Sequence, residues 1–243
     1  MGTINPKKSY EQWHDRFGVD QADTPWHRLV KAHIAPREDL VGKKVLEIGC
    51  GRGGFACWLA EQRPAPNRIV AADFSATAVQ KGRSFAEGKR IGGIDWEIVD
   101  IQAIAHPDRS FDSVFSCETI EHVPSPGKAV RELSRVLKPG GKLFLTTPNY
   151  LGAIGLYRAY LRLRGRPYSE EGQPINNLML LPRTRSMIAQ AGLKVKVIDG
   201  IGHYVPLKGR PPLELPGWNN PRVLMRWLAL HSLTIAEKPT LFQ

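Results

Sequence analysis

The stretch VLEIGCGRGG, residues 45–54, places four glycines directly after a short apolar run. Such a loop lets the backbone approach a phosphate or a nucleoside closely, and the helix that follows points its N-terminus at the ligand. The dinucleotide pattern G-x-G-x-x-G is matched by Gly49, Gly51 and Gly54. The pattern E-x-G-x-G-x-G is matched equally well, by Glu47, Gly49, Gly51 and Gly53. The loop alone therefore leaves the cofactor class open.

Acidic residues at the ends of predicted strands help to decide between the two patterns. Asp73 lies near the end of the run RIVAADF and can hold the ribose hydroxyls that both cofactor classes carry. Asp100 ends the run DWEIVD and is followed by Ile101. This pair suits an adenine ring, because a carboxylate accepts from the exocyclic amine while an aliphatic side chain packs on the ring. A pyrophosphate would need cations rather than the carboxylate of Glu47, so a nucleoside without phosphates is favoured.

The elements that position these residues alternate along the chain. Apolar runs predict seven β-strands, at residues 43–49, 68–74, 95–100, 111–117, 142–148, 194–199 and 233–238. Helical stretches lie between most of them, and Thr24, Ser75 and Pro126 stand at candidate helix starts. Two helices before the first strand are expected to cover the open end of the sheet. The alternation predicts an α/β fold, with a parallel sheet and helices on both faces.

Residues 151–182 interrupt this alternation between the fifth and sixth strands. LGAIGLYRAYLRLRG is predicted to be a helix, and the residues after it are rich in loop-forming types. Insertions of this length in a compact domain are typically lids or binding loops. We therefore expect a single domain in four parts: an N-terminal helical cap (1–40), a cofactor-binding core (41–150), a lid or substrate insertion (151–192) and the closing strands (193–243).

Together these motifs resemble those of the class I S-adenosylmethionine-dependent methyltransferases, over roughly residues 40–150 and the closing strand pair. VLEIGCGRGG is similar to the first motif of that family, AADFSATAV to the second, VDIQAI to the adenine motif and FDSVFSCETIEHVPSP to the fourth-strand motif. The resemblance implies a Rossmann-like sheet of seven strands, mostly parallel with the last antiparallel, and S-adenosylmethionine as cofactor. By the same resemblance, the cofactor-binding residues are Glu47, Gly49, Cys50, Gly51, Gly53, Asp73, Phe74, Asp100, Ile101, Cys117 and Trp13.

The fourth-strand stretch indicates a subgroup. CETIEHVPSP followed by a KPGG turn is similar to the O-methyltransferases of ubiquinone biosynthesis and their small-molecule relatives. Some of these use a divalent cation such as magnesium, held by a Glu-x-x-Glu-His cluster that corresponds here to Glu118, Glu121 and His122. The Asn-Pro-Pro-Tyr motif of nucleic-acid amino-methylating enzymes has no counterpart, since residues 116–119 are SCET. The resemblance thus implies a small-molecule acceptor rather than nucleic acid.

The chemistry of methyl transfer sets what the catalytic residues must do. The sulfonium methyl is already activated, so the enzyme has to align a nucleophile with it and remove the nucleophile's proton. A phenol, with a pKa of about 10, needs a base or a cation for this at neutral pH. The candidates are His122 with Glu121, acting as a base or through a bound metal ion, and His203, which follows the sixth strand. Alternatively, each of these residues only orients its loop.

Aromatic residues on the first predicted helix and arginines in the insertion are further candidates. In this family, residues such as Tyr10, Trp13 and His14 often close over the methionine end of the cofactor, although they also fit an ordinary amphipathic core. The four arginines from 158 to 166 can bind an anionic group of the substrate, or lay residues 151–166 on an anionic membrane as a peripheral contact. A solvated helix face is the alternative.

Composition and charge set the remaining bounds. With 243 residues, 42% hydrophobic and 23% charged, the chain matches an ordinary globular domain. It has no apolar run of 18 residues, and its three cysteines lack a C-x-x-C pair, so we expect a cytoplasmic protein with reduced thiols. The net charge of +11 is uneven, with +3 in residues 1–150 and +8 in residues 151–243. Such a field favours an anionic partner.

We expect the protein to transfer a methyl group from S-adenosylmethionine to a small molecule, onto an oxygen of an aromatic or isoprenoid-like metabolite. Carbon or nitrogen methylation stays open, because the same scaffold serves all three. Two other functions remain as alternatives. One is a nicotinamide-dependent oxidoreductase, which takes the dinucleotide pattern literally, and the other is a nucleic-acid modifier, which the sequence pI of about 9.8 suggests. The sequence predicts no particular oligomeric state.

Overall fold

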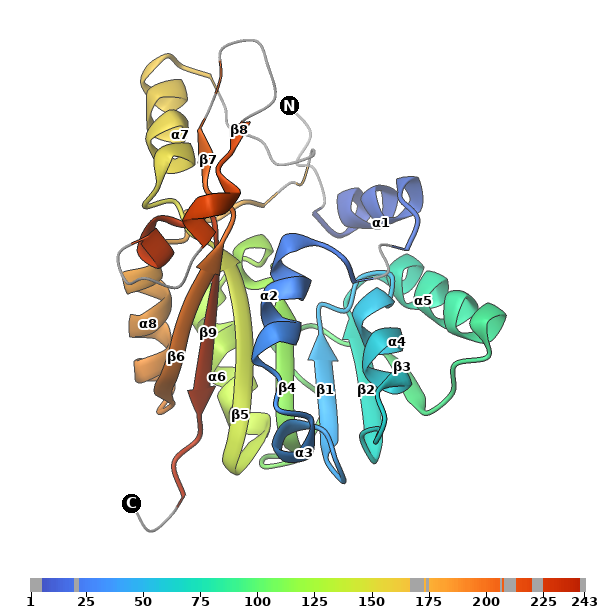
Figure 1. Cartoon of the computed structure of the whole chain (residues 1–243). Coiled ribbons are helices and arrows are strands. Elements are labelled where there is room, and N and C mark those ends of the chain that lie inside the picture. Colours follow the sequence, from blue (N-terminus) through green and yellow to red (C-terminus); the bar gives the residue numbers. More distant parts are fainter. Residues whose placement is uncertain are drawn as a thin grey trace.

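The computed structural model, which describes residues 6–19, 22–166, 173, 175–205, 207, 213–219 and 225–240, centres on one seven-stranded sheet. The strand order is β3-β2-β1-β4-β5-β9-β6 (Figure 1). The strands are β1 (Lys44–Ile48), β2 (Arg68–Asp73), β3 (Ile94–Ile98), β4 (Phe111–Cys117), β5 (Leu137–Pro148), β6 (Lys194–Ile201) and β9 (His231–Glu237). Neighbours pair in parallel except at β9, which runs antiparallel to both β5 and β6. The prediction of a mostly parallel seven-stranded sheet with the last strand antiparallel is confirmed.

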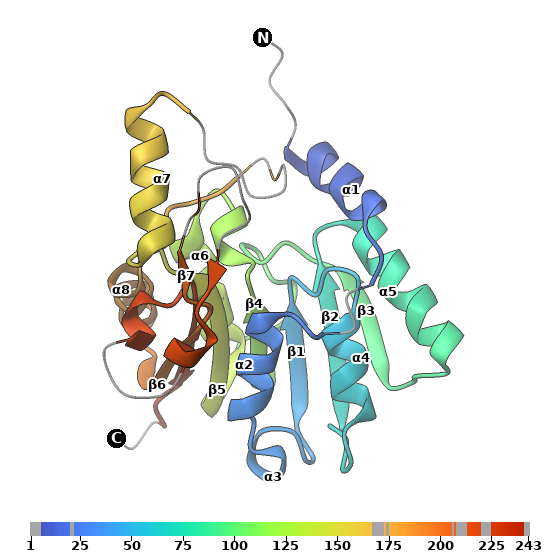
Figure 2. The same ribbon diagram turned by 45° about the horizontal axis from the view of Figure 1, so that its top comes forward.

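Helices cover both faces of this sheet (Figures 1 and 2). The α-helices of the described residues are α1 (Pro6–Arg16), α2 (Pro25–His33), α3 (Pro36–Asp39), α4 (Gly54–Glu61), α5 (Ala76–Lys89), α6 (Pro126–Val136), α7 (Ala153–Leu163) and α8 (Leu181–Gln190). One apolar core joins the sheet to α6 and α8, and a second, on the other face, joins it to α2 and α4. Side chains alternate across each strand, so Val114 belongs to the first core and Phe115 to the second.

Local sequence signals place several of these elements. Thr24 and Ser75 cap α2 and α5, each accepting a hydrogen bond from a backbone N–H of the first helical turn. The insertion after β5 contains the predicted helix, α7, and also α8, which begins within the stretch expected to be loop. A small second sheet pairs β7 (Tyr204–Val205) with β8 (Leu213–Glu214). Strands of two residues carry no alternation, so no sequence pattern predicts them.

The carboxyl ends of the parallel strands form the upper edge of the sheet in Figure 1. Helices α1 and α7 lie beyond this edge in both views (Figures 1 and 2), and the small β7–β8 sheet lies beyond it in Figure 1. Parallel sheets bind their ligands outside this edge, so the candidate site is built there. None of the described helices is both long enough and apolar enough to span a membrane.

Candidate functional site

The glycine-rich loop, residues 49–53, connects β1 to α4 and is tightly enclosed. Gly49, Gly51 and Gly53 have φ angles of +75°, +51° and +81°, in the left-handed region that favours glycine. A Cβ atom at Gly49 would lie 2.2 Å from Thr119 Oγ1, and one at Gly53 would lie 2.3 Å from the ring of Trp96. The backbone conformation therefore favours glycine at all three positions, and the packing requires it at Gly49 and Gly53.

Asp73 is the last residue of β2. Its side chain links the glycine loop to the loop that follows β2. Its carboxylate accepts hydrogen bonds from the backbone N–H groups of Gly51 (2.9 Å) and Ser75 (3.0 Å). The residue is only 4% exposed, and this burial raises its pKa to about 6. An acidic group held beside the bare backbone of Gly51 is placed to accept from ribose hydroxyls, which is the role the sequence predicts for it.

Glu11 of α1 caps helix α5. Its carboxylate accepts hydrogen bonds from Ser75 Oγ (2.8 Å) and from the backbone N–H groups of Ala76 (2.9 Å) and Thr77 (3.0 Å). Partial burial raises the pKa of Glu11, but the hydrogen bonds outweigh it and lower the pKa to about 2. The first turn of α5 thus receives its negative charge from another helix.

Replacing Glu11 with glutamine is expected to lower the free energy of unfolding at pH 7 by about 1 kcal/mol, because a charged cap at a helix N-terminus is lost. The folded-state pKa lies below the ordinary 4.5, so this stabilisation is present above pH 4.5 and is lost as the pH falls through about 2. Urea unfolding at several pH values should therefore show the difference shrinking towards pH 3. Asp15→Asn removes the same charge from a side chain of α1 that is 78% exposed, and an equal loss there would contradict the capping role.

Lys81 of α5 binds the C-terminal end of α1. Its ammonium group donates to the carbonyl oxygens of His14 (3.0 Å), Asp15 (2.6 Å) and Phe17 (3.3 Å), at and just beyond the last turn of α1. The His14 ring lies 3.9 Å from where a Cβ atom of Gly51 would be. Burial lowers the pKa of His14 to about 4, so the ring is neutral at pH 7. The two helices thus bind each other at Glu11, in the middle of α1, and at the C-terminal end of α1, and α1 lies against the glycine loop.

Two aromatic residues of α1, Tyr10 and Trp13, contact Phe74 in the loop after β2 and Arg52 in the glycine loop. Tyr10 packs edge-on against Phe74, with ring centroids 5.3 Å apart, and its hydroxyl lies 3.3 Å from the carbonyl oxygen of His122. The ring of Trp13 lies 5.2 Å from the guanidinium carbon of Arg52. Because Phe74 and Arg52 directly follow Asp73 and Gly51, the structure brings the predicted residues Trp13 and Phe74 to the same edge as the glycine loop.

The other predicted cofactor residues lie at strand ends, with different exposure. Glu47, Cys50 and Cys117 are buried at or just after the ends of β1 and β4. Burial raises the pKa of the Cys50 thiol well above its usual range, so the thiol stays protonated. Asp100 is exposed and accepts a hydrogen bond from a nearby backbone N–H, whereas Ile101 packs into the apolar core and is 4% exposed. Asp100 is thus accessible to a ligand, and Ile101 contributes mainly to the core.

Glu118, Glu121 and His122 do not form the expected metal cluster. His122 Nε2 lies 3.5 Å from Glu121 Oε1, and its Nδ1 bonds to the carbonyl oxygen of Ile175 (2.9 Å). Glu118 pairs instead with His231. Across the residues that the structure describes, no three His, Cys, Asp or Glu side chains are grouped so that they could hold a metal ion. Glu118 and His122 are bonded to protein partners instead, and a divalent cation held by these three residues stays a prediction.

His122 takes part in a junction between two loops. The Ile175 carbonyl can only accept, so Nδ1 of His122 carries a proton, and Nε2 faces the Glu121 carboxylate. Nearby, the side-chain amide of Asn177 donates to the carbonyl oxygens of Glu121 (2.9 Å) and Val123 (2.8 Å). These hydrogen bonds link residues 175–177 to the loop after β4. His122 therefore helps to fix the position of that loop.

A carboxylate–imidazole pair that the sequence does not predict lies at the same edge. Glu118 Oε2 is 3.2 Å from Nδ1 of His231, and the two side chains are 14% and 13% exposed. Glu118 precedes Thr119, the residue that touches the glycine loop, and its φ of +46° is strained for a non-glycine residue, as is common at functional sites. Glu118 Oε1 is buried and has no hydrogen-bond partner among the described residues. The only sequence signal is a histidine shortly before the last predicted strand.

His203 lies among different neighbours. It is 4% exposed, its carbonyl oxygen accepts from the backbone N–H of Leu215 (2.7 Å), and its ring centroid is 6.1 Å from that of Trp218. Burial lowers its pKa, and Nε2 has no hydrogen-bond partner within the described part of the chain. These contacts tie His203 to the region of β7 and β8 rather than to Glu118 or His122.

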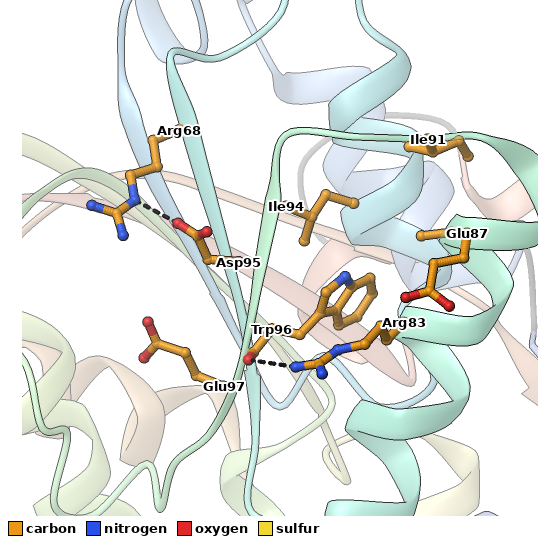
Figure 3. Close-up of a pocket in the computed structure, with 9 residues that line it drawn as sticks. Arg68, Arg83, Glu87, Ile91, Ile94, Asp95, Trp96 and Glu97 are labelled. Atoms are coloured by element: carbon orange, nitrogen blue, oxygen red, sulfur yellow. Dashed lines mark hydrogen bonds and ion pairs between the residues drawn. The ribbon is translucent and has the colours of Figure 1, made fainter.

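A cavity of about 540 Å³ opens between the edge strand β3 and α5 (Figure 3). Its walls are largely charged: Arg68 pairs with Asp95, and Arg83 donates to the carbonyl oxygen of Trp96. The ring of Trp96 also fills the space beside Gly53, so it stands between this cavity and the glycine loop. None of the residues expected to bind the cofactor lines the cavity, and we therefore place the candidate site at the glycine loop.

Comparison with known proteins identifies the family. Residues 46–145 match the model of the methyltransferase domain family. The ubiquinone biosynthesis O-methyltransferase of Neisseria meningitidis is 30% identical over 202 residues, which cover 80% of this chain and 82% of that protein. The chain belongs to the class I S-adenosylmethionine-dependent methyltransferases. The nicotinamide interpretation of the glycine loop is therefore wrong, and the loop is the first motif of a methyltransferase.

Further comparisons agree with the methyltransferase family. Methyltransferase GfsG of Streptomyces halstedii is 29% identical over 134 residues, 55% of this chain and 48% of that protein, so the chain spans about half the length of that relative. A Haloferax volcanii methyltransferase, solved in complex with the Trm112 methyltransferase activator, has the same fold. It gives a TM-score of 0.68 at 20% identity, over 97% of this chain and 98% of that one.

Proposed function

We propose that this methyltransferase transfers the methyl group to a hydroxyl oxygen of a small aromatic or isoprenoid-like acceptor. The Glu118–His231 pair carries the proposal, because a hydroxyl nucleophile must lose a proton and this buried pair borders the glycine loop. Several relatives at about 30% identity are named ubiquinone biosynthesis O-methyltransferases, which supports oxygen as the target atom. Carbon and nitrogen acceptors are the alternative.

The geometry of the pair fits a general base. A carboxylate can only accept, so Nδ1 of His231 carries the proton of the 3.2 Å bond to Glu118, and Nε2 is left as the acceptor atom. The ring packs against Trp26, with centroids 5.0 Å apart, which restricts its orientation. The carboxylate also stabilises the imidazolium that forms when Nε2 takes a proton.

We propose that the cofactor lies along the glycine loop. The left-handed φ angles of Gly49, Gly51 and Gly53 favour glycine, and added side chains at Gly49 and Gly53 would collide with Thr119 and Trp96, so the loop itself carries no side chain at these three positions. Asp73 is placed for the ribose hydroxyls, and Asp100 for the adenine amine. The complete proposed set is Trp13, Glu47, Gly49, Cys50, Gly51, Gly53, Asp73, Phe74, Asp100, Ile101 and Cys117. S-adenosylmethionine, when bound, supplies an activated methyl group.

The proton and the bonds balance without any further reactant. The O–H bond of the acceptor breaks and its proton passes to Nε2 of His231, while the oxygen forms a bond to the methyl carbon. S-adenosylmethionine, held along the glycine loop, would supply this carbon, and the electron pair of its carbon–sulfur bond would stay on the sulfur. His231 then returns the proton to water. Glu118, Glu121 and His122 do not form the ligand set that a divalent cation would need, so no step is assigned to a metal.

We also propose the four-part division of the domain. Residues 1–40 act as the cap, since α1 lies against the glycine loop, and 41–150 form the cofactor-binding core. Residues 151–192, with α7 and α8, form the lid, and 193–243 supply the closing strands. His231 then comes from the closing strands and Glu118 from the core, so the proposed base needs both parts.

The test has two stages. Isothermal titration should show binding of S-adenosylmethionine and S-adenosylhomocysteine, at Kd values of about 1 μM to 1 mM, and no binding of NADH. Radiolabelled methyl transfer to catechols and prenylated phenols is then compared with transfer to amines and hydroxyl-free carbon acceptors, with and without EDTA. Methyl ethers formed at the same rate in EDTA are expected. Products methylated only on carbon or nitrogen would overturn the oxygen assignment, and a loss in EDTA that magnesium restores would reinstate a metal.

A further inference from the structure

Helix α7 presents an apolar stripe to solvent. Leu156, Tyr160 and Leu163 are 74%, 52% and 88% exposed, and their spacing at i, i+4 and i+7 places them on one face of the helix. We call these three residues the α7 stripe. The opposite face serves the fold, since Ile154 is buried and Arg158 donates to both the backbone and the side chain of Asn176. Among the residues that the structure describes, α7 is therefore packed on the side of Ile154 and Arg158 and exposed on the side of the α7 stripe.

Positive charge lies beside the α7 stripe. Arg162, Arg164 and Arg166 are all exposed, in the last turn of α7 and just beyond it. The Arg164 guanidinium carbon is 5.9 Å from the centre of the Tyr160 ring, so a cationic group borders the apolar face directly. The sequence has no acidic residue from position 149 to position 168. The helix therefore combines exposed apolar side chains with cations and contains no carboxylate of its own.

Helix α7 stands out from the rest of the fold. In both views α7 projects beyond the edge of the sheet as a single rod (Figures 1 and 2). It contacts β7, and the two short strands of that sheet add exposed apolar side chains, Val205 at 38% and Leu213 at 53%. A projecting helix can rest on a flat surface along its whole length.

We propose that the α7 stripe rests on the surface of an anionic lipid bilayer. Leu156 and Leu163 enter the region between headgroups and acyl chains, and the Tyr160 ring lies at headgroup level, where such amphipathic rings are favoured. Arg162 and Arg164 reach the lipid phosphates through their long side chains. The inference does not depend on which acceptor the enzyme methylates.

A second copy of the chain is the competing occupant of this surface. A two-fold contact of one α7 stripe on another would bring together the arginines of both copies. The helices contain no acidic residue that could pair with these arginines, so like charges would meet. Anionic lipid headgroups neutralise the same arginines instead. Charge therefore favours the bilayer.

The test is co-sedimentation of the full chain with vesicles of phosphatidylcholine, alone or with about one-third phosphatidylglycerol. We expect at least about tenfold tighter binding to the anionic vesicles, weakened by salt at about 0.5 M. The double variant Leu156→Ser, Leu163→Ser should bind at least about fivefold more weakly, because it removes apolar side chains from the interface. Replacing Arg162, Arg164 and Arg166 with glutamine should remove the preference for anionic lipid. All five positions are exposed, so these variants should fold.

Ile98→Ser provides the matched control, because Ile98 is also an exposed aliphatic residue, at 59%, but lies at the end of the opposite edge strand. It should bind vesicles as the unaltered chain does. Failure to bind anionic vesicles at low salt, or equal binding by the stripe variant and the Ile98 variant, would overturn the proposal. Analytical ultracentrifugation tests the competing occupant. A dimer that the double leucine variant converts to a monomer, without vesicle binding, would assign the stripe to a subunit interface instead.

Discussion

Replacing His231 with glutamine is expected to lower kcat by about 10²–10⁴-fold, the usual contribution of a general base. Glutamine can still donate to Glu118, but it offers no atom that takes a proton at neutral pH. The affinity for S-adenosylhomocysteine should stay within about twofold, because the variant leaves the glycine loop untouched. Methyl transfer at saturating cofactor measures the first effect, and calorimetry with S-adenosylhomocysteine measures the second.

Variants of the other candidate residues separate this role from a structural one. Glu118→Gln keeps the imidazole but no longer favours the correct tautomer, so kcat should fall by roughly 10²-fold or more. His203→Gln, near β7 and β8, should leave kcat nearly unchanged. His122→Gln should act on stability and KM, because the bond of His122 to Ile175 fastens two loops. A large loss of kcat in either of these last two variants, with His231→Gln fully active, would move the base away from His231.

The second large effect is expected at Asp73. Asp73→Asn should raise the Kd for S-adenosylmethionine about 10²-fold, because hydrogen bonds to a charged acceptor contribute about 1.5–3 kcal/mol. In the folded protein the Asp73 carboxylate accepts hydrogen bonds from the backbone N–H groups of Gly51 and Ser75. The asparagine amide nitrogen would place a donor against one of these two N–H groups. Asp95→Asn removes the same charge from an exposed position on β3 and should bind normally. Normal binding by Asp73→Asn itself would exclude the proposed ribose contact.

The affinity for the cofactor should also depend on pH through Asp73. Burial raises its pKa to about 6, so the carboxylate that accepts from ribose forms only as the pH rises through this value. Calorimetry between pH 5 and 8 should therefore show S-adenosylhomocysteine binding more tightly at the higher pH, and the Asp73→Asn variant should lack this step. For folding, the sign is opposite. A raised pKa favours the folded state below the ordinary 3.8, and this contribution is lost as the pH rises through about 6.

Much of the fold follows from local patterns in the sequence. The strands show as short apolar runs, and the helix starts show as cap residues such as Thr24 and Ser75, because both signals arise from interactions within a few residues. The glycine loop is equally local, and its three left-handed residues are the glycines that the motif contains. These features could be predicted because each depends on interactions between residues that are close in the sequence.

The contacts that complete the site have no such local cause. Glu11 caps α5 from a helix that lies 64 residues before Ser75, and His231 meets Glu118 across 113 residues. Both partnerships depend on how whole elements pack. The separation of Glu118 from Glu121 and His122 has the same cause, because Glu118 bonds to His231 and His122 bonds to Ile175, partners that lie far away in the sequence.

The place of β9 between β5 and β6 has a consequence for how the enzyme is made. Strands β1 to β5 pair among themselves within residues 44–148, so these five strands of the sheet can form early in synthesis. Strand β6 has β9 as its only neighbour in the described sheet, and β9 follows it by 30 residues of chain. The glycine loop can therefore fold during synthesis well before His231 has been made. Catalytic competence would be acquired last, when the final strand inserts and closes the sheet.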